Sequence, residues 1–175
     1  TNLSNNQRRK EWFKNNIYKL IISTNIMLTI MRNKEIKKIL SEIKDQFDCG
    51  IKGEHLFLIS KNDKVYIANP ELQEINTENL KINNTGSYFG KIERAGFRLS
   101  IEGSEILDNP KKNILELTDE EFQAYMAGEN LMLDEKQENA YKIIKYKKHF
   151  IGCGRVSNNV LLNYIPKARR AKENN

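Results

Sequence analysis

The stretch 139–156, NAYKIIKYKKHFIGCGRV, carries the pattern on which the fold prediction rests. Two runs rich in β-branched and aromatic residues, 139–146 and 149–156, flank the dipeptide Lys147-Lys148. Such runs on either side of a short polar turn are typical of a β-hairpin. In the second run, Gly152-Cys153-Gly154 predicts close strand packing or a bulge. It lacks the longer glycine motifs that bind dinucleotides or triphosphates.

Short elements surround this hairpin on both sides. Residues 114–117, ILEL, predict a strand, and the run 160–162 predicts another. Thr118 and Glu121 have the capping-box spacing, which predicts a helix that begins at Thr118. Gly128 is the expected end of that helix, because glycine readily adopts the left-handed conformation of a C-cap. The second half of the chain is therefore predicted to be mostly β.

The first half predicts one helix and two further hairpins. Residues 34–45 have apolar side chains every three or four positions, which indicates an amphipathic helix that stops before Gly50. The runs 56–59 and 65–67 flank a polar turn and predict a hairpin. The runs 87–93 and 97–101 predict a second hairpin with Phe97, Leu99 and Ile101 on one face.

Composition divides the chain into four segments. Residues 1–30 are rich in Asn and form an extension that is either one helix over 12–30 or not native, with Met31 as a candidate natural start. A small α/β domain is expected at 31–107. The segment 108–113 contains a proline and no apolar side chain, so it is the candidate linker. A second domain is expected at 114–175.

Charge is concentrated at the ends of this 175-residue chain, whose net charge is +6. Residues 33–140 contain 14 basic and 21 acidic residues, whereas residues 141–175 contain nine basic and one acidic. A folded body with one cationic face favours a nucleic acid as partner. The nine basic residues alternate with tyrosines and a phenylalanine, which suits phosphate contact combined with base stacking. They are Lys142, Lys145, Lys147, Lys148, Arg155, Lys167, Arg169, Arg170 and Lys172.

The sequence offers little for metal, redox or membrane chemistry. Its two histidines stand alone, and Cys49 and Cys153 are too far apart in the chain for a zinc or disulfide-exchange motif. Two reduced thiols are typical of a cytoplasmic protein. No cofactor is expected, because the sequence has no dinucleotide or triphosphate motif. The apolar run 17–31 is shorter than the roughly 20 residues that span a bilayer, so no membrane anchor is expected.

The last 65 residues resemble a PUA domain, a small β-barrel that binds structured RNA. The resemblance rests on the strand at 114–117, the helix that ends in YMAGENL at 125–131, and the strands 141–146 and 150–156. It implies an α+β protein with a PUA-type β-barrel. It also implies RNA contacts from the helix end, the basic strands and the tail. The expected RNA-binding residues are Gly128, Asn130, Lys145, Lys147, Lys148, Arg155, Tyr164, Lys167, Arg169 and Arg170.

Two further resemblances bear on the role of the protein. YFGK at 88–91, FRL at 97–99 and the hairpin before Pro70 look like the pre-PUA domain of the archaeal and eukaryotic Nip-type ribosome-biogenesis factors. The tail 163–170, NYIPKARR, is more similar to the ends of PUA-like modules in Nop/Sun-type RNA cytosine methyltransferases. Those enzymes attack cytosine through a Pro-Cys thiolate, and none of the three prolines here precedes a cysteine.

These resemblances imply a non-catalytic RNA-binding protein that acts on structured rRNA or tRNA in ribosome biogenesis or RNA modification. The RNA is expected along a groove between the helix that ends at Gly128 and the basic strands. Two alternatives remain open: an accessory subunit of an RNA-modifying enzyme such as a cytosine methyltransferase, and a protein-interaction scaffold. The acidic excess of residues 33–140, which include most of the pre-PUA region, favours a protein partner there.

Overall fold

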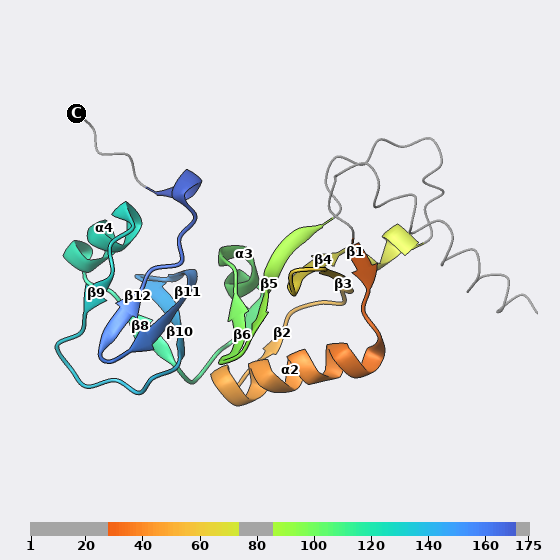
Figure 1. Cartoon of the computed structure of the whole chain (residues 1–175), viewed down its shortest axis with the longest axis horizontal. Coiled ribbons are helices and arrows are strands. Elements are labelled where there is room, and N and C mark those ends of the chain that lie inside the picture. The colour runs from red at the N-terminus through yellow and green to blue at the C-terminus, as the bar shows by residue number, and fades with distance from the viewer. Residues whose placement is uncertain (1–27, 74–85, 171–175) are drawn as a thin grey trace, which may run out of the picture.

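The computed structural model describes residues 28–73 and 86–170 (Figure 1). Within this part of the chain, strands form two five-stranded sheets and one two-stranded ribbon. The N-terminal sheet has the order β1-β3-β4-β5-β6, and the C-terminal sheet has the order β8-β10-β11-β12-β9. Together with three α-helices among the described residues, this agrees with the predicted α+β class.

The N-terminal sheet contains both predicted hairpins. β3 (Leu56–Ser60) pairs with β4 (Lys64–Ala68), and β5 (Ser87–Glu93) pairs with β6 (Gly96–Leu99), all antiparallel. Phe97 and Leu99 are buried, as the alternation predicts.

The prediction for Ile101 is wrong, because this residue begins helix α3 (Ile101–Glu105) instead of continuing the strand. Ser100 is the N-cap, and its Oγ accepts a hydrogen bond from Gly103 N at 2.8 Å. This bond satisfies a backbone donor of the first helical turn, which explains why the strand ends there.

The edge of the N-terminal sheet corrects part of the prediction for the extension. Leu28–Ile30 form strand β1, which pairs with β3 and is not the end of a helix. Leu28 is buried, so burial of its side chain and pairing with the open edge of β3 outweigh helix propensity here. The remainder of the extension, 1–27, lies outside the described residues.

Helix α2 (Asn33–Phe47) runs along the N-terminal sheet (Figure 1) and buries Ile39, Ile43 and Phe47. The predicted glycine stop is wrong in detail, because Asp48 occupies the left-handed C-cap position with φ 51°. Gly50 instead begins β2 (Gly50–Ile51), which pairs with β7 (Leu107–Asp108).

The predicted linker, 108–113, connects the two sheets and is firmly attached to α2. The backbone N–H groups of Lys111 and Lys112 donate to Phe47 O at 3.0 and 3.2 Å. Asn113 Nδ2 donates to Gln46 O at 2.6 Å, and Asn113 O accepts from the backbone N–H of Ile143 at 2.8 Å. The segment therefore ties the end of α2 to the first central strand of the C-terminal sheet.

The C-terminal sheet curls into a half-barrel around one helix. β8 (Ile114–Glu116) pairs in parallel with β10 (Tyr141–Tyr146). The remaining pairs are antiparallel: β10 with β11 (His149–Ser157), β11 with β12 (Val160–Leu162), and β12 with β9 (Leu131–Met132). Helix α4 (Asp119–Ala127) begins with the predicted capping box and ends at Gly128, whose φ is 99°. A 3₁₀ turn, η4 (Lys167–Arg169), follows the sheet.

The β10–β11 hairpin contains the predicted bulge. Its register shifts between Ile144 and Lys145, which pair with Gly152 and Phe150, so Ile151 is the extra residue. Gly152 has φ 137°, a conformation that side chains strongly disfavour. Gly152 thus shapes the strand at this bulge.

The two sheets share one hydrophobic core. Tyr141, Ile143 and Cys153 of the C-terminal sheet belong to the same cluster as Phe97 and Leu99 of the N-terminal sheet. A second cluster joins the other face of the C-terminal sheet to α4. No helix within 28–73 or 86–170 is long and apolar enough to cross a membrane.

Candidate nucleic-acid interface

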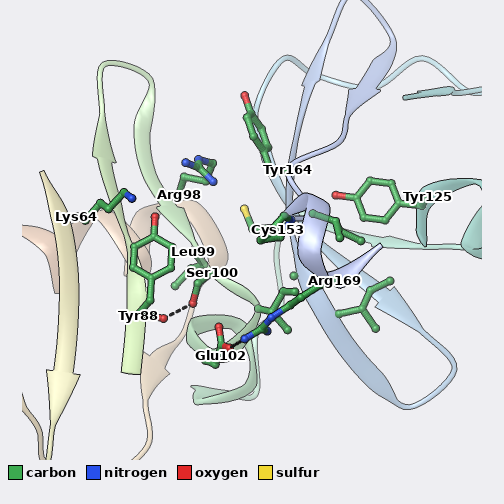
Figure 2. Close-up of a pocket in the computed structure, with 15 residues that line it drawn as sticks. Lys64, Tyr88, Arg98, Leu99, Ser100, Glu102, Tyr125, Cys153, Tyr164 and Arg169 are labelled. Atoms are coloured by element: carbon green, nitrogen blue, oxygen red, sulfur yellow. Dashed lines mark hydrogen bonds and ion pairs between the residues drawn. The ribbon is translucent and has the colours of Figure 1, made fainter. Parts of the chain in front are cut away.

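A cleft of about 310 Å³ lies between the two sheets, and we call it the inter-sheet cleft (Figure 2). Residues from β4, β5, β6 and α3 line one side, and residues from α4, β11 and the segment leading to η4 line the other. The lining residues are Lys64, Tyr88, Arg98, Leu99, Ser100, Ile101, Glu102, Tyr125, Ile151, Gly152, Cys153, Tyr164, Ile165, Pro166 and Arg169.

The floor of the inter-sheet cleft is apolar and uncharged. Leu99, Ile165, Tyr125 and Cys153 are all buried. Burial raises the pKa of the Cys153 thiol to about 12 and also raises the pKa of Tyr125. Both groups are therefore neutral at pH 7, and the Cys153 thiol is a poor nucleophile because its thiolate form is scarce.

Cations and aromatic rings meet around this floor. The guanidinium of Arg98 lies over the ring of Tyr164, with Cζ 4.5 Å from the ring centroid. Lys64 Nζ lies 5.9 Å from the ring centroid of Tyr88. Each pair is within the range of cation–π attraction, and the first joins β6 to the segment that follows β12.

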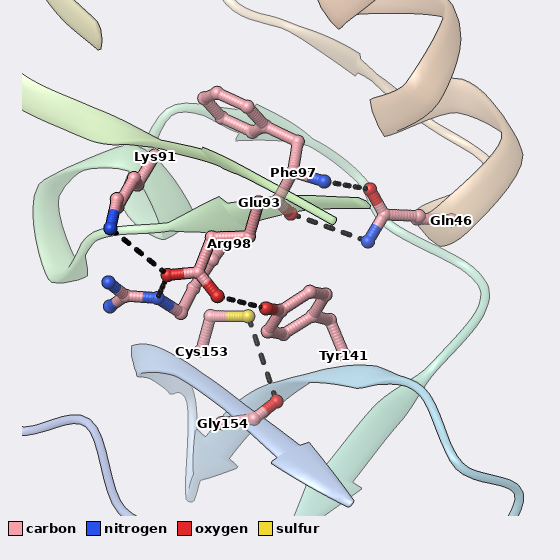
Figure 3. A network of polar contacts seen from close by, with 8 residues as sticks. All are labelled: Gln46, Lys91, Glu93, Phe97, Arg98, Tyr141, Cys153 and Gly154. Atoms are coloured by element: carbon pink, nitrogen blue, oxygen red, sulfur yellow. Dashed lines mark hydrogen bonds and ion pairs between the residues drawn. The ribbon is translucent and has the colours of Figure 1, made fainter. Parts of the chain in front are cut away.

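Arg98 is fixed by a polar network on Glu93 (Figure 3). Arg98 Nε donates to Glu93 Oε1 at 3.0 Å, and the Tyr141 hydroxyl donates to Glu93 Oε2 at 2.5 Å. Burial alone would raise the pKa of Glu93, but the hydrogen bonds from Tyr141 and Arg98 outweigh it and lower the pKa below its ordinary value. Glu93 is therefore ionised at pH 7 and holds Arg98 in place.

Only some of the predicted RNA-binding residues reach the inter-sheet cleft. Tyr164 and Arg169 line it, and Arg169 also forms an ion pair with Glu102. Arg170 lies outside it, where its Nε donates to Ile165 O at 3.2 Å.

Gly128 and Asn130 both contact other residues of the protein itself. A Cβ at Gly128 would lie 2.5 Å from Arg170 Nε, so this position must be glycine for the arginine to pack there. Asn130 Oδ1 accepts from the backbone N–H of Asn163 at 2.9 Å. The backbone at Gly128 is thus approached closely by a side chain of the protein itself.

Lys145, Lys147 and Lys148, which we call the turn cations, lie at the other end of α4. Lys147 Nζ lies 3.3 Å from Asp119 Oδ1 and 4.6 Å from the ring centroid of Tyr146. Asp119 is the first residue of α4, and a nine-residue helix separates its ends by about 13 Å. Gly128 and the turn cations therefore lie at opposite ends of α4, and the groove expected between this helix and the basic strands remains a prediction.

The remaining predicted cations are distributed over the surface or buried. Lys148 and Lys167 are exposed, and Arg155 is half-buried on β11. The prediction of a phosphate contact from Lys142 is wrong. Its side chain is buried, and Nζ donates to Asn113 Oδ1 at 3.1 Å because the linker covers this strand.

Sequence reasoning missed Lys64, Tyr88 and Arg98, which the N-terminal sheet contributes to the cleft. The acidic excess of residues 33–140 had favoured a protein partner for this half, but residues 31–107 contain 12 basic and 12 acidic residues. One local signal was available: Arg98 stands between the buried Phe97 and Leu99, so strand alternation places it on the opposite face. No local pattern reports that Tyr164 lies against it.

The C-terminal part of the chain is similar to a known protein family. Residues 112–171 match the family model described as the Methyltransferase RsmF PUA domain. The match supports a PUA-like domain, and PUA domains bind RNA. A comparison with curated proteins gave no match.

Proposed function

We propose that this chain is a non-catalytic RNA-binding protein that acts on structured rRNA or tRNA in RNA modification. The observation that carries the proposal is the match of residues 112–171 to a PUA domain of a methyltransferase family. Cations and aromatic rings around the inter-sheet cleft add support, because their combination suits phosphate and base contacts.

The non-catalytic role is supported by the state of the two thiols. Burial raises the pKa of both Cys49 and Cys153, so neither is a ready nucleophile. A cytoplasmic location and a role of the pre-PUA region in ribosome biogenesis belong to the same proposal.

A second candidate is an accessory part of an RNA-modifying enzyme. The methyltransferase context of the matched domain favours it. In that case the chain positions RNA for an active site on a partner. Methyltransferase activity that appears only when this chain is added to the partner enzyme would distinguish the second candidate from the first.

The proposal is tested by the affinity of the full chain for transcribed tRNA and rRNA fragments at several salt concentrations. We expect the logarithm of the binding constant to fall linearly with the logarithm of salt, by about 0.7 to 0.9 per phosphate contacted. Double-stranded DNA of the same length serves as the comparison ligand. Binding that is absent at low salt, or that is equal for DNA and RNA, contradicts the proposal.

A charge reversal of Arg169 and Arg170 tests the tail. We expect the double change to Glu to weaken RNA binding at least tenfold, because it replaces two cations with anions. The matched control is the double change of Lys37 and Lys38, two exposed cations of α2 that do not line the cleft. An equal effect of both double variants would show that only overall charge matters.

A further inference from the structure

We propose that the inter-sheet cleft binds one unpaired nucleotide of the RNA, with its base on the apolar floor beside Tyr88 and its phosphate at Lys64 and Arg98. The inference rests on the proposed function and extends it. It assigns RNA contact to the N-terminal sheet, in the part of the chain for which the sequence analysis favoured a protein partner.

The size of the cleft limits the ligand. Pockets that bind small molecules usually have volumes of about 300 to 1,000 Å³. The inter-sheet cleft, at about 310 Å³, lies at the lower end of that range. It is therefore suited to a single base, and the adjoining nucleotides would lie outside it.

The apolar and aromatic residues of the lining favour a flat aromatic group such as a nucleobase. Leu99, Ile151 and Ile165 supply apolar surface, and Tyr88 and Tyr164 supply rings from the two sides of the cleft. Stacking of a base on an aromatic ring does not depend on base identity, because every base has a π-face.

The charge of the lining favours an anion. It contains three cations, Lys64, Arg98 and Arg169. Arg169 is paired with Glu102 and Arg98 with Glu93, which does not line the cleft, so Lys64 supplies the uncompensated positive charge among the described residues. Lys64 is exposed, and it forms no ion pair with any residue of 28–73 or 86–170. Its ammonium can therefore meet a phosphate without breaking an ion pair in that part of the chain.

The cleft is also formed before ligand arrives. Glu93 fixes Arg98 through Nε, and the Tyr141 hydroxyl fixes Glu93 from the other sheet (Figure 3). The shared core behind these residues holds the two walls together. A site with fixed walls spends less binding free energy on ordering its own side chains.

The decisive experiment measures RNA affinity for Tyr88→Ala, Tyr88→Phe and Lys64→Ala, with Lys37→Ala as the matched control for charge. Tyr88→Ala is expected to weaken binding about 5- to 100-fold, the loss of one base–ring stack, whereas Tyr88→Phe keeps the ring and retains affinity. Lys64→Ala is expected to reduce the salt slope by about 0.7, and Lys37→Ala to leave it unchanged.

Ultraviolet crosslinking of the wild-type chain to RNA supplies a readout that does not depend on how the variants fold. Mapping by mass spectrometry is expected to place the adduct on Tyr88, Tyr164 or a neighbouring residue of the cleft. Thermal unfolding of each variant separates loss of the site from loss of the fold.

The outcomes distinguish this inference from the proposed function. If the wild-type chain binds no RNA, the proposed function fails. If it binds RNA but Tyr88→Ala and Lys64→Ala bind equally well and the crosslinks lie elsewhere, only the nucleotide site is overturned. A nucleoside monophosphate that competes as well as the RNA would assign the cleft to a free nucleotide. Loss of a co-purifying protein, with unchanged RNA affinity, would assign it to a protein partner.

Discussion

The two faces of the C-terminal sheet are covered in different ways. Ile143 and Ile144 are neighbours in β10 and neither has exposed surface, yet they belong to different cores. Ile143 faces the core shared with the N-terminal sheet, and Ile144 faces α4. One strand of the PUA-like region therefore also packs in the core shared with the N-terminal sheet, so the domain boundary expected from the sequence is not a boundary in packing.

The largest expected losses of stability come from Ile143→Ala and Ile144→Ala, which each truncate a buried side chain in one of the two cores. Each change should lower the free energy of unfolding by about 2 to 5 kcal/mol, because each leaves a cavity in a packed core. For Ile143→Ala we expect a single urea transition in which both sheets lose stability together. Circular dichroism and hydrogen exchange measure this transition. Separate transitions for the two sheets would show that the shared core does not couple them.

A smaller loss of stability is expected when the Tyr141 hydroxyl, which links the two sheets, is removed. Tyr141→Phe keeps the ring and removes the hydrogen bond to the Glu93 carboxylate, which should cost about 1 to 3 kcal/mol. The control is Tyr146→Phe on the same strand, whose hydroxyl donates to the exposed Asp119 at 2.8 Å. We expect Tyr146→Phe to cost less in a urea titration, since water can replace that bond. Equal losses would contradict a special role for the inter-sheet bond.

Thr118→Ala tests the stability of α4, the helix that covers the face of the C-terminal sheet opposite the shared core. Thr118 Oγ1 accepts from Glu121 N at 3.2 Å, and loss of such a cap costs about 1 kcal/mol. Hydrogen exchange should become faster in α4 and remain unchanged in α2. The control is Ser41→Ala, an exposed position within α2, which should be neutral. Faster exchange throughout the chain would mean that α4 is not a local unit.

The smallest expected effect is a pH dependence of the inter-sheet network. The pKa of Glu93 is lower in the folded protein than its ordinary value of about 4.3. The unfolded chain therefore binds the proton more tightly, so the contribution of Glu93 is complete above about pH 4.3 and is lost as pH falls through the lower folded pKa. The stability difference between wild type and Glu93→Gln should shrink in that window. A difference that stays constant with pH would contradict the assignment.

Local chemistry explains what the sequence predicts well. The capping box at Thr118, the C-cap at Gly128 and the bulge near Gly152 each depend on residues within a few positions. The cleft depends on Arg98 and Tyr164, which are 66 positions apart and meet only after the two sheets pack. The burial of Lys142 could not be predicted for the same reason, because the residue that covers it, Asn113, is 29 positions away in the chain. Charge counted along the chain cannot report such contacts.

The side chain of Gln46 has a consequence for association between molecules. β6 is the last strand of the N-terminal sheet, so its outer backbone groups could pair with a strand of another chain. The Gln46 amide accepts from Phe97 N at 3.0 Å and donates to Phe97 O at 3.3 Å, in the manner of a neighbouring peptide group (Figure 3). A single glutamine from α2 thus takes the place of an additional strand at that residue. It protects the sheet edge against the edge-to-edge pairing that leads to aggregation.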